Sequence, residues 1–516
     1  MTSRESTEGY EGGHPLQLKS SHESPTEKNP VQMSEGQTQH HETFDALKVI
    51  EYPESRVTWD GDNDPENPRN WPMRRKKIFT LAVSMMVFSV SFASSVFGSA
   101  NKVVGAKFGA SSEVMDLTVT LFVAGFAIGP LFWGPFSEVK GNTTPLCVAV
   151  AGAAIFQIPL GLAQNVQTVL VSRFLAGAIG SGVLAVGSGM FSKIYGPIHR
   201  AVAVGTTSTF MNLGSALGPI VGSYTVEYAG WRWLAWITLI LCVVVGLNAM
   251  FTVRECSGDV LLVRKARRLR KETGNELLHA PLEEEEGIDF SALVHHHLSK
   301  PLRMITQEPI LITMTVYLTI VYGSFYLAYS MFTYAFELRG WSSTTATLPF
   351  IAVYIGQIIA FTYCTWYNLK PYRRVFEAKG YCTPEDRLPP MILGAFILPP
   401  SLFWFGWAMK THWMCQIVAA CFVGVGLQLI FITGIVYIID VYMTCPNSAV
   451  SIHVVCRSLI SSTFALWCTP MYDALGVEWT STVLGAVALV FMPAPYIFRR
   501  YGVAIRKSSK FSDAHF

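Results

Sequence analysis

The stretch AVAVGTTSTFMNLGSALGPIVGSYT (201–225) decides the fold, because none of its 25 residues carries a charge. A helix needs roughly 20 apolar residues to cross the ~30 Å hydrocarbon layer of a membrane. Within lipid the backbone must satisfy its own hydrogen bonds, and a segment this long and this uniformly apolar does so as a helix. The stretch therefore predicts a membrane-spanning helix.

Eleven further stretches of similar length lie on either side of this one. The twelve predicted spans are 78–100, 114–136, 144–163, 167–190, 201–225, 232–253, 310–336, 345–366, 391–409, 413–440, 448–472 and 478–498. The composition agrees, since only 15% of the residues are charged and the mean hydropathy is +0.34, whereas soluble domains have roughly 25% charged residues. We predict an all-α integral membrane protein with twelve transmembrane helices.

The spans form two groups of six on either side of a charged segment. This layout is typical of transporters in which two pseudo-symmetric six-helix bundles move about a central site. The predicted parts are a disordered cytoplasmic N-terminal tail (1–77), an N-terminal bundle (78–253), a cytoplasmic linker (254–309), a C-terminal bundle (310–498) and a cytoplasmic C-terminal tail (499–516).

The distribution of Lys and Arg predicts the orientation. Most of them fall in loops on the side of the two termini, and the opposite loops hold only Lys102, Lys107, Arg232, Arg339 and Lys410. Loops rich in Lys and Arg stay in the cytoplasm. Both termini are therefore expected there, and the net charge of +3 reflects contact with the lipid bilayer rather than with nucleic acid.

The linker contains a basic run, RKARRLRK (264–271), and three histidines, His295 to His297. The basic run is typical of a surface helix near anionic lipid, and a regulatory or partner-binding role is the alternative. The histidines lack Cys or carboxylate residues at the spacing of a metal site. We expect no metal and no cofactor.

Small residues in two spans indicate close helix packing. Gly214, Gly218 and Gly222 recur at intervals of four and share one helix face, and Pro219 bends the same helix. Packing alone would explain the glycines, but the added proline favours an interface that moves. In the preceding span, Gly177 follows Arg173. An arginine inside a span usually faces protein or water, and a snorkelling side chain is the alternative.

Proton coupling needs a titratable group that water reaches from each side in turn. Our candidates are Glu227, Asp440 and Arg457, and Asp440 is a plausible partner for Arg457. Like Glu227 and Asp440, the other carboxylates lie near the ends of spans: Asp116, Glu337 and Asp473 near the outer ends and Glu138 near an inner end. Carboxylates near an interface are also often structural.

One helix face predicts substrate contacts. Tyr322, Tyr326 and Tyr329 recur at helical spacing, and aromatic rings with polar tips suit bulky, partly apolar ligands or cations, although they also fill helix interfaces. Asn212 and Gln357 are polar groups in otherwise apolar spans. We expect both to face the same cavity.

Several motifs make the chain resemble the major facilitator superfamily. RFLAGAIGSG (173–182) and GSALGPIVG (214–222) resemble its motifs in spans four and five. A finer resemblance, to the fungal drug:proton antiporters with twelve spans, rests on VTWDGDNDPENPRNWP (57–72), GWRWLAWI (230–237) and YIIDVY (437–442). It covers nearly the whole chain from Val57 to Tyr501 and implies export coupled to protons, usually at the plasma membrane.

The loop GPFSEVKGNTTP (134–145) departs from the family pattern. It keeps Gly134, Glu138 and Gly141, but Asn142 and Thr143 occupy the places of two basic residues. In the family this loop is a cytoplasmic latch. Its electrostatic part is therefore expected to be weaker here, with Lys140 as a partial replacement.

The leading hypothesis is a monomeric secondary transporter that exports a small organic compound, such as a drug, a toxin, a secondary metabolite or an organic acid, in exchange for protons. Uptake or facilitated diffusion through the same fold is the alternative, because a fold alone does not separate them. A membrane enzyme is disfavoured, since HExxH, G-x-S-x-G and P-loop motifs are absent. A transport-dead sensor would be expected to have a long structured tail.

Overall fold

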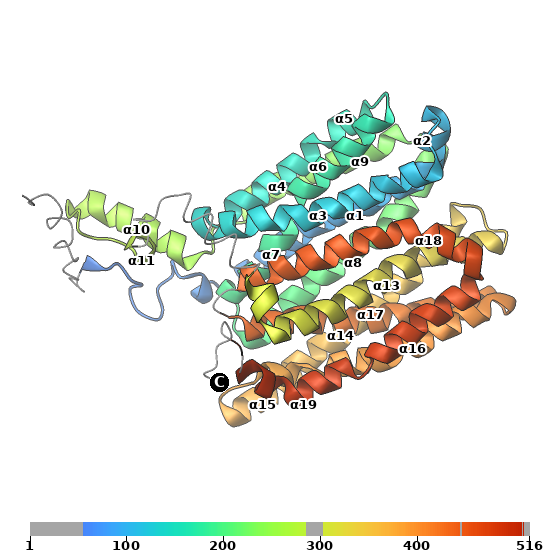
Figure 1. Cartoon of the computed structure of the whole chain (residues 1–516). Coiled ribbons are helices and arrows are strands. Elements are labelled where there is room, and N and C mark those ends of the chain that lie inside the picture. The colour runs from blue at the N-terminus through green and yellow to red at the C-terminus, as the bar shows by residue number, and fades with distance from the viewer. Residues whose placement is uncertain (1–54, 285–302, 444–445, 508, 510–516) are drawn as a thin grey trace, which may run out of the picture. The chain divides into compact units, whose positions relative to one another are not determined.

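The computed structural model describes residues 55–284, 303–443, 446–507 and 509, and long helices make up most of these ranges (Figure 1). In the first half of the chain the helices are α1 (Met73–Val96), α2 (Asn101–Phe108), α3 (Ser112–Lys140), α4 (Thr143–Ile155), α5 (Gln157–Gly161), α6 (Val166–Gly180), α7 (Gly182–Ile194), α8 (Pro197–Tyr228) and α9 (Arg232–Thr252).

The linker and the second half continue the helical pattern. Their helices are α10 (Gly258–Thr273), α11 (Pro281–Glu284), α13 (Pro309–Leu338), α14 (Phe350–Tyr367), α15 (Arg373–Lys379), α16 (Pro389–Trp407), α17 (Trp413–Val441), α18 (Pro446–Phe491) and α19 (Ala494–Lys507). A short helix, η7 (Pro384–Arg387), precedes α16.

Each predicted span falls on one or two of these helices. Ten helical stretches of the described chain are long and apolar enough to cross a membrane by themselves. The other two predicted spans, 201–225 and 448–472, lie in α8 and in the first part of α18. Both are richer in Gly, Ser and Thr, and most of the described side chains of these two spans are at least partly buried. α18 breaks at Gly476, whose φ of 71° is left-handed, so it supplies two spans.

The helices pack as two six-helix bundles. In the first, α1 lies against α8 and α9, and α3 lies against α6; in the second, α17 lies against α14 and α16. Across the two bundles α3 contacts α18, and α8 contacts α14 and α17. The substrate path of such a fold runs between the bundles, where these cross-bundle helices meet.

The described part of the predicted disordered tail, from residue 55 onward, is ordered. α1 begins at Met73, and Val57 is buried in a small cluster with Leu262, Val263 and Ala266 of α10. The basic run of the linker therefore forms a helix as predicted, but one of its faces packs on protein rather than on lipid. Residues 1–54 and His295 to His297 lie outside the described residues.

A buried charge joins the segment before α1 to α10. Lys265 Nζ lies 3.3 Å from Asp64 Oδ2 and 2.7 Å from Asp60 Oδ1. Burial alone would raise the pKa of Asp64, but hydrogen bonds from two backbone amides and from Lys265 hold its pKa below the usual 3.8. Burial alone would lower the pKa of Lys265, but the carboxylates of Asp60 and Asp64 raise it above its usual value.

We predict that Asp64→Asn loosens this segment by about 1.5–3 kcal/mol at neutral pH, the value of a hydrogen bond to a charged group. Because the folded pKa of Asp64 is lowered, its contribution is present above pH 3.8 and is lost as the pH falls through the folded value. Protease cleavage between residues 55 and 72 measures the opening. Equal cleavage of the two proteins at pH 7 would contradict the prediction.

The predicted C-terminal tail is partly a helix. Its expected start at residue 499 falls inside α19, and Arg506, which is 5% exposed, lies 3.3 Å from Glu385 of η7. The described part of this segment is thus docked on the second bundle.

Candidate functional site

A cavity of about 380 Å³ lies between the two bundles. It opens on the side away from Met73 and α19, which we call the far side; the opposite side is called the terminal side. Its walls come from α1, α3 and α8 of the first bundle and from α13 and α18 of the second. At its mouth Lys102 Nζ lies 3.4 Å from Glu337 Oε2. We call this space the outer cavity.

The predicted tyrosine face of α13 borders the outer cavity. Tyr326 and Tyr329 line it together with Phe325 and Phe350. The ring of Tyr329 packs on Phe325 at 4.1 Å and on Phe350 at 4.7 Å between centroids. All three tyrosines were predicted to contact the substrate, and the structure places two of them, Tyr326 and Tyr329, on the outer cavity. Their rings offer an apolar surface with a polar edge.

The remaining predicted cavity residues lie one step deeper. Tyr322, Asn212 and Gln357 line a space of only about 10 Å³, which we call the middle cavity. Asn212 donates to Gln428 of α17, and Gln428 donates to Thr209 over 3.2 Å, so α8 and α17 are joined across the bundles. The buried Gln357 amide and the Tyr329 hydroxyl have no hydrogen-bond partner among the described residues.

A third space, the inner cavity, lies nearer the terminal side and measures about 50 Å³. Its polar lining consists of Ser188 of α7, Thr207 and Ser208 of α8, and His453 and Arg457 of α18. Phe325 is shared by the outer and middle cavities, and Met211 by the middle and inner ones. The three cavities thus follow one another along the interface between the bundles.

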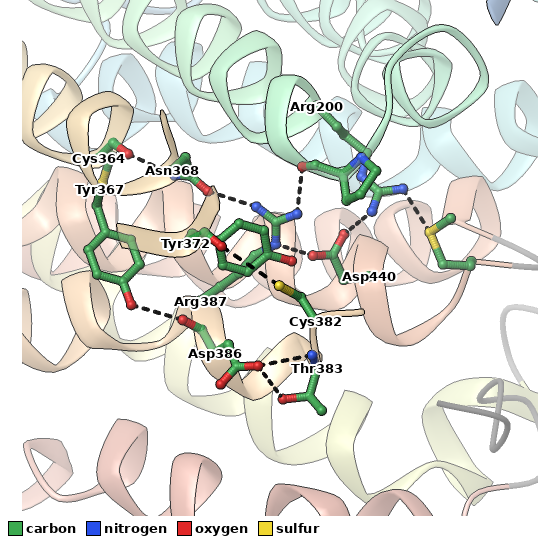
Figure 2. Close-up of polar contacts among 12 residues, drawn as sticks. Arg200, Cys364, Tyr367, Asn368, Tyr372, Cys382, Thr383, Asp386, Arg387 and Asp440 are labelled. Carbon is green, nitrogen blue, oxygen red and sulfur yellow. Dashed lines mark hydrogen bonds and ion pairs between the residues drawn. The ribbon is translucent and has the colours of Figure 1, made fainter. Parts of the chain in front are cut away.

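A network of charged side chains closes the terminal side (Figure 2). Asp440 of α17 accepts hydrogen bonds from Arg200 of α8 and from Arg387 of η7, and the three side chains are at most 6% exposed. Arg387 also donates to Pro197 O over 2.6 Å and to Asn368 Oδ1 over 2.7 Å. Arg200 and Pro197 belong to the first bundle, and Asp440, Arg387 and Asn368 belong to the second. We call Asp440, Arg200 and Arg387 the terminal lock, because their contacts hold the two bundles together on the terminal side.

Close backbone packing accompanies the lock. A Cβ atom added to Gly189 of α7 would lie 1.4 Å from Asn447 Oδ1 of α18, and one added to Gly134 of α3 would lie 3.0 Å from Ser451 Oγ. Glycine is needed where helices approach this closely. The terminal side of the interface is therefore shut while the far side holds the outer cavity.

The expected pairing of Asp440 with Arg457 is wrong. Arg457 instead stacks over the rings of Tyr322 at 4.2 Å and Phe431 at 5.1 Å, and its Nε has no hydrogen-bond partner in the part of the chain that the structure describes. Cation–π contacts contribute about 0.5–2 kcal/mol, whereas burying an ion costs several kcal/mol. The rings alone do not balance the burial of Arg457, which is 2% exposed.

Arg173 is similarly buried, but each of its three guanidinium nitrogens donates a hydrogen bond. It donates to Thr118 O over 3.0 Å, to Ala93 O over 2.5 Å and to Ser94 O over 2.6 Å. Its guanidinium also lies 4.3 Å above the ring of Phe122. Arg173 therefore does not snorkel to the membrane surface; it ties α6 to α1 and α3.

The predicted glycine motifs lie at helix contacts within the first bundle. Added Cβ atoms would lie 2.6 Å from Phe88 O at Gly214, 2.0 Å from Ser95 Oγ at Gly218 and 2.6 Å from Val96 O at Gly222, so all three pack on α1. At Gly177 the added atom would lie 2.2 Å from Phe122 O of α3. Pro219 lines the outer cavity, and its carbonyl accepts from Ser99 over 3.2 Å.

The unusual loop between α3 and α4 binds a carboxylate. Gly141 has a φ of 86°, and the backbone amides of Asn142 and Thr143 donate to Glu255 over 3.1 and 3.2 Å. A carboxylate at the N-terminus of a helix is favourable. Lys140 is exposed, and the side chain of Glu138 lies outside the described residues. Glu255 thus holds the loop through backbone amides.

The structure does not bring the three proton-coupling candidates together. Glu227 is exposed near the far end of α8, Asp440 lies in the terminal lock, and Arg457 lies between them in the inner cavity. Arg200, Arg387 and His453 were not among the predicted site residues. Arg387 stands in the PEDRLPP stretch (384–390). Arg200 carries no local signal because its partner Asp440 comes from a distant helix, and His453 carries none because its surroundings in the inner cavity come partly from α7 and α8.

Comparison with known proteins identifies the family. A family model described as Major Facilitator Superfamily matches residues 83–465. The citrinin biosynthesis cluster MFS transporter of Monascus ruber is 40% identical over 466 residues, which cover 88% of this chain and 92% of the relative. The cercosporin MFS transporter of Cercospora nicotianae is 36% identical, with 90% and 91% covered.

A multidrug transporter of Candida glabrata is 32% identical, with 88% of this chain and 79% of the relative covered. Among solved structures, the proton:xylose symporter XylE has a TM-score of 0.63 at 14% identity, covering 84% of this chain and 96% of the symporter, and this similarity concerns the fold alone. The chain belongs to the major facilitator superfamily. It is a multi-pass membrane transporter of the fungal drug-efflux type rather than an enzyme, as the sequence motifs predicted.

Proposed function

We propose that this transporter exports a small, partly aromatic organic compound, in the class of fungal secondary metabolites and drugs, in exchange for protons. The observation that carries the proposal is the pairing of an outer cavity of about 380 Å³ with a shut terminal side. Relatives named for citrinin, ascochitine and cercosporin, and a multidrug relative, support the class of compound.

In this proposal both termini lie in the cytoplasm and the protein works in the plasma membrane as a monomer. The excess of Lys and Arg in the loops of the terminal side supports that orientation. The far side then faces the outside of the cell, and the conformation with the outer cavity is the one that releases the compound. The opposite state, with the terminal side open, would load it from the cytoplasm.

Asp440 is the proposed coupling carboxylate, and Glu227 is the second candidate. A proton on Asp440 would remove the negative charge that holds Arg200 and Arg387 in one place. Two buried guanidinium groups without an anion repel each other and favour water. Protonation would therefore open the terminal side, and release of the proton to the cytoplasm would let the lock form again.

The test is accumulation of a mixed panel of drugs, metabolites and organic acids in efflux-deficient yeast that expresses the chain, with and without a protonophore. We expect at least one compound to be depleted from the cells and the depletion to vanish with the protonophore. Accumulation instead of depletion would favour an uptake carrier. Depletion that ignores the protonophore would contradict the proton coupling.

A further inference from the structure

The inner cavity holds polar groups that the helix packing does not use. His453 is 1% exposed, and neither of its ring nitrogens has a hydrogen-bond partner in the described chain; the same holds for the hydroxyls of Ser188 and Ser208. Buried polar groups are nearly always paired. Three such side chains, with four unpaired polar atoms around one space, therefore indicate a ligand that is bound during part of the transport cycle.

The charge of this space is positive. Arg457 projects into it, and its lining among the described residues contains no Asp or Glu. The carboxylate of Asp440, on the terminal side, is engaged by Arg200 and Arg387. Arg173, by contrast, donates hydrogen bonds to three backbone carbonyls. Arg457 therefore has hydrogen-bonding capacity that a ligand with negative charge would satisfy.

We propose that Arg457 and His453 form a subsite for the carboxylate of an aromatic organic acid. The proposal rests on the proposed export function and narrows its substrate class. The guanidinium would form two parallel hydrogen bonds with the carboxylate oxygens, a geometry that arginine favours. His453 and Ser208 would donate further hydrogen bonds from the wall of the inner cavity.

The surroundings accommodate the rest of such a compound. The rings of Tyr322 and Phe431 contact Arg457 on the side of the middle cavity, so an aromatic group attached to the carboxylate would lie among apolar rings. The inner cavity of about 50 Å³ is the size of one or two water molecules. It holds the acidic group alone in the present state, and the whole compound needs the bundles to move apart.

The test uses the purified full-length protein in detergent and three aromatic carboxylates, benzoate, cinnamate and 1-naphthoate, each with its methyl ester. Thermal stabilisation at increasing concentration gives the affinity. We expect at least one acid to bind ten-fold or more tightly than its ester. Arg457→Gln should lower the affinity for the acid by about ten- to a hundred-fold, the range for a charged hydrogen-bonded pair. The affinity for the ester should not change.

Two further variants separate a binding role from a general effect. His453→Gln, which keeps a hydrogen-bond donor, should weaken the acid less than His453→Leu. Arg373→Gln removes an exposed positive charge on α15 and should change the affinity for neither the acid nor the ester. Binding of acid and ester with equal affinity, no acid binding by the parent protein, or acid binding that survives Arg457→Gln overturns the subsite.

The same acids and esters in the yeast assay distinguish the two proposals. Protonophore-sensitive export of neutral compounds without any acid would leave the exporter standing and overturn the subsite. Acid binding by the purified protein without any export would support the subsite and contradict the exporter.

Discussion

Asp440→Asn is expected to reduce export at least ten-fold while the protein still folds and inserts. The substitution leaves Arg200 and Arg387 buried without an anion, and removing one partner of a buried ion pair costs about 3–5 kcal/mol. That cost applies only while the terminal side is shut, because both guanidinium groups reach water when it opens. A shift of this size changes the ratio of the two states by a factor of roughly a hundred or more.

The measurement is the initial rate of export per amount of folded protein in the membrane, with the compound found by the panel. Glu377→Gln is the matched control, since it breaks an exposed ion pair with Arg373 of the same α15 helix, and exposed pairs contribute little. Export by Asp440→Asn at the rate of the control would show that the terminal lock does not govern the transport cycle.

Gly177→Ala is expected to lower stability by about 1–3 kcal/mol, and by more if α3 and α6 cannot separate. The added Cβ would lie 2.2 Å from Phe122 O and 3.0 Å from its carbonyl carbon, so it meets backbone rather than a side chain that can rotate. The separation of α6 from α3 would also strain the hydrogen bond from Arg173 Nε to Thr118 O. The yield of monodisperse protein and its melting temperature measure the effect.

Gly246→Ala is the control for that experiment. Its added Cβ would lie 3.4 Å from Val150 Cγ1, at ordinary contact distance, and alanine favours a helix over glycine by up to about 1 kcal/mol. We expect this variant to equal or exceed the parent in melting temperature. Equal melting temperatures for Gly177→Ala and the parent would mean that the α3–α6 contact is not tightly packed.

The sequence was sufficient to predict the twelve spans, because each span is a local property of about 20 residues. The same holds for the tyrosine face of α13, whose helical spacing is visible without any tertiary contact. Tyr326 and Tyr329 indeed line the outer cavity. The tail boundary was misjudged because the polar residues 55–72 look unfolded in isolation and are ordered by packing on α10.

The pairing of charges could not be predicted from the sequence in the same way. Asp440 and Arg457 lie 17 positions apart on neighbouring helices. Arg457 is thus closer to Asp440 in the sequence than either of its actual partners, Arg387 and Arg200. Their actual partners depend on which ends of α8, α17 and η7 meet, a property of the assembled bundles. His453 is a single histidine in an apolar span, and only the assembled helices α7, α8 and α18 place it beside Arg457 in the inner cavity.

The most direct test of the account is the reactivity of two single cysteines, Thr333→Cys in the outer cavity and Ser208→Cys in the inner cavity, towards a membrane-impermeant thiol reagent applied to intact cells. The signal is taken above that of the protein without the added cysteine. In intact cells we predict that Thr333→Cys reacts with the reagent and that Ser208→Cys does not. When Asp440→Asn is added, the reaction of Thr333→Cys in intact cells should fall, and Ser208→Cys should become reactive in inside-out vesicles. Reactivity of Thr333→Cys only in inside-out vesicles, or an unchanged pattern with Asp440→Asn, would contradict an exporter whose terminal lock controls which side is open.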